Sequence, residues 1–421
     1  MANPKVTLRE ELIFILNQAS ELEHSLTCSY LFTALSLKDR IEDGLNEETL
    51  AAVRNWKGVF TEIAIDEMMH LAIVNSLLVA VGGAPNFDRP NFPHNCAYFM
   101  PDLVISLQPF SQKTVQHFIA VEQPLGGDAI SPNTPDAASQ VDGDLDNEIG
   151  ADPYVLDSQG DLYGLIAGGL RNLALRLGEE NLFIGPESRP AFVSFMESCG
   201  WRPVTGLQSA LHAVARIVEQ GEGASGDNPD SHYWKFRRIH DEFVALKQKY
   251  PDFEPAYPVL ENPFARTPPE QQGAVNLIDD EYAIQISDLF NEAYTSFLLV
   301  LGRFFALTDE SDEEATALAE ASFWLMKQAI LPLGGMLTRM PAGAAHPGLT
   351  AGPSFVVRTM HVLPYKNAAW RLLRERFEEL AVYTDNLAGD NPGSSLPGIR
   401  DAFVSITAML TQKTGAAGTA V

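Results

Sequence analysis

The stretch FTEIAIDEMMHLAIV, residues 60–74, places Glu67 and His70 three positions apart inside a strongly apolar helical pattern. Residues three apart lie on the same face of a helix. That face belongs to an apolar stripe with spacings of three and four, which consists of Val53, Trp56, Phe60, Ile63, Glu67, His70, Val74 and Leu77. The pattern predicts a helix over residues 47–81 that ends at Gly82 and turns both polar groups toward a core. A buried carboxylate and imidazole are costly unless they are paired or bind a metal, so we expect partners from elsewhere in the chain.

The N-terminal region predicts a second helix with the same anomaly. TLRE, residues 7–10, has the pattern of a capping box, with Thr7 at the cap and Glu10 reaching back. The apolar stripe that follows is formed by Leu12, Leu16, Ala19, Glu23, Leu26 and Tyr30. Glu23 therefore lies on a core-facing side of the helix, either as a metal ligand or as a buried acid that is hydrogen-bonded to Tyr30. Two helices that each bury a carboxylate are typical of a bundle whose core holds two metal ions.

The rest of the chain predicts an all-α protein with two helical regions. Residues 1–250 are expected to form a metal-binding four-helix bundle, with an irregular insertion at about 84–160 in which DLVISL, residues 102–107, could form a strand. Residues 276–390 predict a second, C-terminal helical bundle packed on the first. Residues 391–421 are expected to be a partly disordered tail.

Composition excludes several classes of protein. The net charge of −26 repels phosphate backbones, so we expect no nucleic-acid partner. Cys28, Cys96 and Cys199 are far apart and form no CxxC pair, which favours a reducing, cytoplasmic location. The N-terminus lacks the apolar core of a signal peptide, and the most apolar later run, residues 296–307, is too short to span a membrane. We expect no membrane partner.

Further candidate ligands have alternative interpretations. Glu219 and Glu222 lie three apart near the end of a predicted helix, where they could instead be a solvated helix end. His232 opens the apolar face of the next helix and could instead cap it. Asp161 begins another helix, but SQGD, residues 158–161, is itself a capping-box pattern.

Several stretches together resemble the ferritin-like family found at the C-terminal end of iminophenyl-pyruvate dimer synthases, enzymes of bisindole pigment pathways. The stretches are LNQASELEHSLTCSYLF (16–32), EIAIDEMMHLAIVNSLLVAVGG (62–83), GDLYGLI (160–166), IVEQGEG with SHYWKF (217–236), and PLGGMLTRMP with GPSF (332–355). The resemblance is spread over most of the chain. It implies a ferritin-like four-helix core able to hold a dimetal centre.

The resemblance also assigns roles to single residues. Glu23 followed by Tyr30 matches the first-helix pattern of ferritins, and Glu67 with His70 matches the second-helix motif. Asp161 stands where the family has Glu, and its shorter side chain implies that one metal is weakly held.

The resemblance bears on the fourth helix and on the reaction as well. The fourth helix has Glu-x-x-Glu in place of Glu-x-x-His, so that His232 would supply the missing nitrogen. The pigment enzymes dimerise an aromatic imino acid and work with haem, whereas this sequence has no CxxCH motif.

Our leading hypothesis is a dinuclear non-haem iron oxidoreductase or oxygenase that acts with O₂ on an unknown small molecule. Two iron ions, or manganese or zinc ions, would be bound by Glu23, Glu67, His70, Asp161, Glu219 and His232, with Glu222 either as a further ligand or as a residue that contacts a ligand. Tyr30 is the candidate catalytic residue, as a redox-active neighbour or as a hydrogen-bond donor to a ligand. The alternatives are oxidative coupling or imine chemistry on an aromatic amino-acid derivative, and a non-catalytic metal-binding structural protein. In either case the region 276–390 could form a homodimer surface.

Overall fold

The protein is described here from a computed structural model. The described residues are 5–95, 103–123, 159–221, 228–266, 276–357, 363, 365–390 and 395–414. Within them the regular secondary structure is almost entirely helical, and the four strands have two residues each. The predicted all-α class is therefore confirmed.

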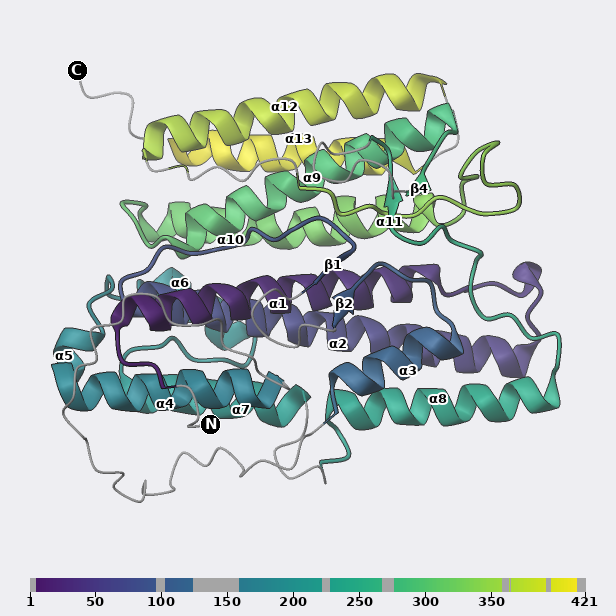
Figure 1. Ribbon diagram of the computed structural model, residues 1–421. Coiled ribbons are helices and arrows are strands. Elements are labelled where there is room, and N and C mark those ends of the chain that lie inside the picture. The colour runs from purple at the N-terminus through teal and green to yellow at the C-terminus, as the bar shows by residue number, and fades with distance from the viewer. Residues whose placement is uncertain are drawn as a thin grey trace.

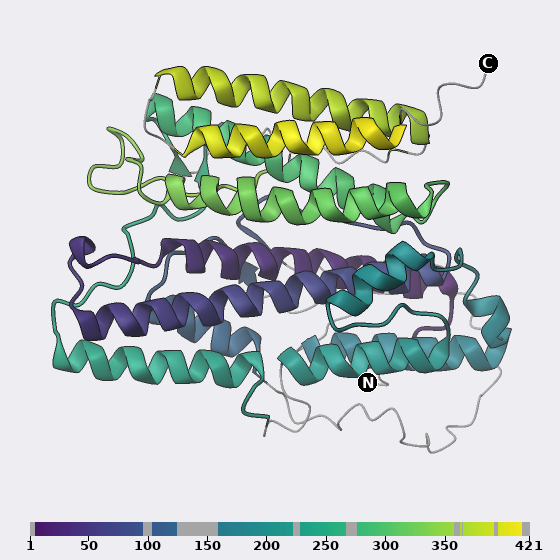
Figure 2. The same ribbon diagram turned by 180° about the vertical axis from the view of Figure 1, so that it is seen from behind.

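The first bundle is organised around two long antiparallel helices, α1 (Arg9–Ser36) and α2 (Glu47–Ala80), which make the most extensive helix–helix contact within the described residues. Its other helices are α3 (Gln112–Val121), α4 (Gln159–Leu177), α7 (Leu207–Gly221) and α8 (His232–Lys249). α3 packs on α8, and α4 packs on α7. Figures 1 and 2 show the first pair beside one half of α1 and α2 and the second pair beside the other half. The third and fourth positions of the bundle are thus each built from two helices placed end to end.

Local sequence explains where the long helices begin and end. The capping box predicted for α1 is shifted by one residue, because the Glu11 carboxylate, and not Glu10, accepts hydrogen bonds from the backbone N–H groups of Thr7 (2.7 Å) and Leu8 (2.9 Å). α2 begins after Asn46, whose side chain caps it, and ends before Gly82, whose φ of +90° favours glycine. The predicted end of this helix is confirmed.

The second helical region stacks on the α1 side of the first bundle. It contains α9 (Glu281–Phe305), α10 (Asp312–Leu325), a π-helical turn (Met326–Ile330), α11 (Leu331–Leu337), α12 (Lys366–Asp390) and α13 (Leu396–Thr414). Figure 1 shows α12 and α13 outermost, with α9, α10 and α11 between them and α1. α13 lies inside the segment 391–421 that was expected to be a partly disordered tail; its buried Leu396, Ile399, Phe403 and Ile406 join the hydrophobic core.

Short elements complete the described chain. They are a 3₁₀ turn (Ile41–Asp43), α5 (Glu179–Leu182), α6 (Pro190–Ser198), the antiparallel pair β1 (His94–Asn95) and β2 (Val104–Ile105), and the parallel pair β3 (Pro263–Phe264) and β4 (Asn276–Leu277). β2 falls within the strand expected at 102–107. The predicted insertion also contains α3, a helix of the bundle that was not predicted from the sequence. Much of the remaining insertion lies outside the described residues.

α2 is long and apolar enough to cross a membrane by length and composition. However, 72% of its most apolar window is buried inside the protein, as expected for the inner helix of a bundle. We therefore interpret α2 as a core helix.

Candidate metal centre

Two triads of buried carboxylates and histidines lie in the core of the first bundle. One consists of Glu23, Glu67 and His70, and the other of Glu67, Glu122 and His232. Within each triad, one potential ligand atom per residue lies within 4.8 Å of the others. We call these five residues the carboxylate–histidine cluster. Because Glu67 belongs to both triads, the arrangement corresponds to two neighbouring metal positions that share one carboxylate.

The cluster lies at the middle of the bundle, where its short helices meet end to end. Glu23 comes from the middle of α1, and Glu67 and His70 come from the middle of α2. Glu122 directly follows the last residue of α3, and His232 is the first residue of α8. Three residues are thus held by continuous helices and two by helix ends.

The contacts of Glu67 show how it connects the two triads. Its Oε2 lies 3.1 Å from His70 Nδ1, and its Oε1 lies 2.9 Å from His232 Nδ1. The outer glutamates are farther away, with Glu23 Oε2 at 3.5 Å from His70 Nδ1 and Glu122 Oε2 at 3.9 Å from His232 Nδ1. Each oxygen of Glu67 therefore serves a different triad, which is the geometry of a bridging carboxylate.

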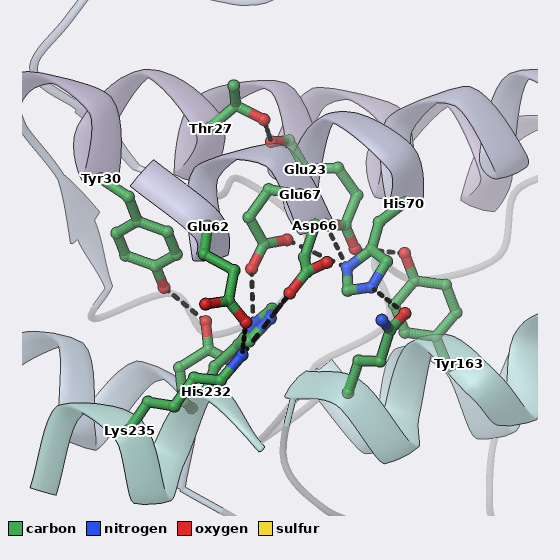
Figure 3. Close-up of polar contacts among 12 residues, drawn as sticks. Glu23, Thr27, Tyr30, Glu62, Asp66, Glu67, His70, Tyr163, His232 and Lys235 are labelled. Carbon is green, nitrogen blue, oxygen red and sulfur yellow. Dashed lines mark hydrogen bonds and ion pairs between the residues drawn. The ribbon is translucent and has the colours of Figure 1, made fainter. Parts of the chain in front are cut away.

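The far nitrogen of each histidine contacts an acceptor outside the cluster. His70 Nε2 lies 3.2 Å from Gln220 Oε1, and His232 Nε2 lies 3.3 Å from Asp66 Oδ2. An Nε2–H that donates to such an acceptor leaves Nδ1 free to offer its lone pair. Both Nδ1 atoms face the carboxylates of the cluster, as Figure 3 shows for His70 and Glu67.

Two buried tyrosines hold the outer glutamates. The Tyr163 hydroxyl donates to Glu23 Oε1, and the Tyr30 hydroxyl donates to Glu122 Oε1. Burial and the adjacent carboxylates raise the pKa of both tyrosines well above their usual range, so both remain proton donors. The oxygens that these hydroxyls do not contact are the ones that face the histidines.

Burial makes the cluster rich in protons when no metal balances it. Burial, followed by repulsion from Glu67, raises the pKa of Glu23 to about 8 and that of Glu122 to about 7. Burial alone would raise the pKa of Glu67 too, but His70 and His232 overcome this effect and hold its pKa below the ordinary value. Attraction to Glu67 outweighs burial at His232 and raises its pKa to about 9. Metal ions that bind here would replace these protons.

The donor atoms of the cluster fit metal ions better than they fit one another. Glu23 Oε2, Glu122 Oε2 and His232 Nδ1 are buried and have no hydrogen bond of good geometry within the described residues, although groups of opposite charge lie within 4 Å of each. Buried polar atoms left in this way are costly unless something else satisfies them. Carboxylate oxygens and imidazole nitrogens together suit iron, manganese or zinc. The residues present therefore fit two bound metal ions.

The structure brings together most of the predicted site residues. Glu23, Glu67, His70 and His232 meet in the cluster, and Tyr30 contacts it through Glu122. The predicted alternative of a Glu23–Tyr30 hydrogen bond is not formed, since the hydrogen bond to Glu23 comes from Tyr163.

Other predicted residues lie elsewhere. The side chain of Asp161 is exposed on the first turn of α4, and Tyr163, two residues later, points inward instead. Glu219 is exposed and accepts a hydrogen bond from the Asn228 side chain (2.8 Å), while the neighbouring Gln220 contacts the cluster. Glu222 lies outside the described residues.

Glu122 is a residue of the cluster that was not predicted from the sequence. A signal was present, because Val115, Phe118 and Glu122 have the three-and-four spacing of a buried helix face. The short helix lies in a segment punctuated by proline, asparagine and glycine, which made that segment look irregular throughout.

Comparisons with known proteins identify the family of the first bundle. A family model described as ferritin-like matches residues 16–241, more than half of the chain. A dichlorochromopyrrolate synthase from Lentzea aerocolonigenes is 26% identical over 95% of this chain and 41% of its own length. A 2-imino-3-(indol-3-yl)propanoate dimerase from Chromobacterium violaceum is 27% identical over 83% of this chain and 34% of its own length. The chain thus matches less than half the length of either relative.

A crystal structure of a ferritin-like protein from Caulobacter vibrioides aligns with 72% of this chain and 89% of its own, at 19% identity and a TM-score of 0.44. The family match rests on the sequence model, which covers all five residues of the carboxylate–histidine cluster. The chain therefore belongs to the ferritin-like family.

Proposed function

We propose that the protein is a two-metal enzyme that couples an imine derived from an aromatic amino acid. The observation that carries the proposal is the buried carboxylate–histidine cluster, with Glu67 shared between two metal positions. The choice of substrate is supported by the two relatives, whose names describe a synthase and an imine dimerase.

The chain's own residues would hold the metals and keep their surroundings fixed. Glu67 would bridge the pair, with Glu23 and His70 on one side and Glu122 and His232 on the other. Tyr163 and Tyr30 donate hydrogen bonds to one oxygen of Glu23 and of Glu122, respectively, which would leave the other oxygen of each glutamate available to a bound metal. Bound redox-active metals, with iron as our first choice, would supply the electron transfer that none of these side chains provides.

The coupling has a simple balance. Each of two imine molecules loses one hydrogen atom from the carbon that forms the new bond, and the two carbons then join. The two protons and two electrons released pass to dioxygen or peroxide, which is the oxidant that the proposal requires. The product has twice the mass of the imine less two hydrogens.

The test uses the full chain loaded with iron. The imine of indole-3-pyruvate is generated from tryptophan with an amino-acid oxidase, and the mixture is analysed by mass spectrometry for the dimer. We expect the dimer with the wild type, none with Glu67→Ala, and an unchanged yield with Glu48→Gln, an exposed surface control. Equal dimer yields with and without the protein, at full metal loading, would refute the choice of reaction.

A second candidate is a dinuclear non-haem iron oxidoreductase or oxygenase acting on another small molecule. It is favoured by the cluster itself, whose geometry does not depend on the substrate. Oxygen consumption by the reduced, iron-loaded protein in the absence of any imine would support it. A non-catalytic metal-binding protein would show neither product nor redox cycling under oxygen. In all three cases a cytoplasmic location fits the small number of cysteines, of which Cys28 and Cys199 are free.

A further inference from the structure

The two halves of the carboxylate–histidine cluster match contact for contact. Each half has one histidine whose Nδ1 lies close to Glu67, one outer glutamate, and one tyrosine that donates to that glutamate. The first half consists of His70, Glu23 and Tyr163, and the second of His232, Glu122 and Tyr30. These contacts give little reason for one metal position to bind more tightly than the other.

The acceptor behind each histidine breaks this symmetry. The contacts have almost the same length, 3.2 Å from His70 Nε2 to Gln220 Oε1 and 3.3 Å from His232 Nε2 to Asp66 Oδ2. One acceptor is a neutral amide, whereas the other is a carboxylate. A carboxylate behind an imidazole makes the imidazole a stronger metal ligand and adds a negative charge near the ion. The acceptors of the two histidines therefore lie at nearly equal distances but differ in charge.

We propose that the two metal positions are unequal, and that the position between Glu122 and His232 binds its ion first and more tightly because of Asp66. The proposal rests on the proposed two-metal function. It assigns Asp66 a positioning role, since this residue acts through His232.

The charges around the two histidines reinforce the difference. Lys235 Nζ approaches Asp66 at 3.8 Å but lies closer to Glu62, at 2.8 Å, so that the ammonium group is largely balanced by Glu62 (Figure 3). The three groups together keep one net negative charge beside His232.

The surroundings of His70 differ in sign. Trp201 packs edge-on against this histidine, with ring centroids 6.1 Å apart, and the guanidinium of Arg216 lies 4.1 Å above the Trp201 ring. A positively charged group therefore lies behind Trp201 on the His70 side. Both effects favour a cation at the His232 position.

The solvent exposure of Asp66 limits how much it can raise the metal affinity of the His232 position. The side chain of Asp66 is 23% exposed, so solvent weakens its field. Changes to groups that orient a metal ligand typically alter metal affinity by about 10-fold to 100-fold. We expect the lower end of this range, on the order of a 10-fold preference.

The experiment measures where the first ion goes. The full chain is stripped with a chelator, supplied with one equivalent of Mn²⁺ without oxygen, and crystallised, and the anomalous signal of manganese gives the occupancy of each position. We expect the ion mainly at the His232 position. In solution, electron paramagnetic resonance should show mainly the isolated Mn²⁺ signal below one equivalent, and the coupled signal of two neighbouring ions should grow as the second position fills.

Two isosteric variants test the cause. Asp66→Asn makes both acceptors neutral and should bring the occupancies close together. The double variant Asp66→Asn with Gln220→Glu exchanges the two charges and should move the first ion to the His70 position. Glu48→Gln removes a remote, exposed charge and should keep the wild-type ratio. A general loss of stability would lower both occupancies without reversing their order.

Equal occupancies in the wild type, a first ion at the His70 position, or an unchanged ratio in Asp66→Asn would each overturn the proposal. The wild-type measurement decides the order even where a variant does not fold. If two ions bind with equal affinity, the proposed two-metal function still stands and only the inequality of the two positions is refuted. Uptake of neither ion would remove both.

Discussion

The substitution Glu122→Gln tests the residue that the structure adds to the site. Burial raises the pKa of Glu122 from its ordinary value of 4.5 to about 7 in the metal-free protein, so the folded state holds this proton more firmly than the unfolded state does. The stabilisation from the bound proton is fully present below pH 4.5 and is lost as the pH rises through 7. A glutamine at this position cannot titrate, so the variant lacks this loss.

The expected magnitude follows from the same values. A pKa that rises from 4.5 to about 7 corresponds to a loss of about 3 kcal/mol in the free energy of unfolding once the carboxylate is ionised. Relative to the variant, the metal-free wild type should therefore lose on the order of 2–3 kcal/mol between pH 5 and pH 8. The prediction concerns the change of this difference with pH, so a constant packing cost of the glutamine does not affect it.

The assay is urea unfolding of chelator-treated protein at a series of pH values, with Glu219→Gln, at an exposed residue outside the cluster, as the control variant. In a parallel metal titration, Glu122→Gln should retain about half of the wild-type metal. A flat difference for Glu122→Gln, together with unchanged metal content, would contradict both the burial of this carboxylate and its place in the cluster.

Three further outcomes are expected. Chelation should lower the melting temperature measured by calorimetry, because an ion present at 100 times its dissociation constant stabilises the folded state by about 2.7 kcal/mol; an unchanged temperature on re-addition of metal would count against specific binding. Arg303→Met should lower the free energy of unfolding, measured with denaturant, by about 3–5 kcal/mol, because it leaves the buried Glu310 without its ion pair. A decrease below about 1 kcal/mol would show that water reaches this pair. Gly185→Ala should lower the free energy of unfolding by at least about 2 kcal/mol, because the added Cβ would lie 2.1 Å from the backbone oxygen of Val79. Gly168→Ala in α4, where the added Cβ meets open space, should raise the free energy of unfolding by about 1 kcal/mol. Equal effects of the two substitutions would refute the close packing at Gly185.

The interior of the long helices could be predicted from sequence. Glu23, Glu67 and His70 lie in the middle of α1 and α2, where several turns of apolar residues on each side fix the orientation of every position. A polar residue in such a stripe is visible as an exception, and its burial follows from the residues around it.

Helix ends could not be predicted in the same way. Asp161 and Glu219 lie within one or two residues of the positions that face the cluster, which are occupied by Tyr163 and Gln220. Near a terminus few apolar neighbours fix the rotation of a helix, so a register error of one residue moves a side chain from the core to the surface. The prediction also assumed that the residues facing the cluster at these helix ends would be acids. They are instead the phenol of Tyr163 and the amide of Gln220.

The end-to-end arrangement of helices in the bundle divides the site into two parts with different freedom to change. Glu23, Glu67 and His70 are built into continuous helices, and shifting any of them would require a shift along the whole of α1 or α2. Glu122 and His232 stand at the ends of α3 and α8, where a residue can be inserted or removed without moving a long helix. The ligands at these two helix ends can therefore be replaced, by evolution or by design, while the ligands on α1 and α2 and the fold of the protein stay the same.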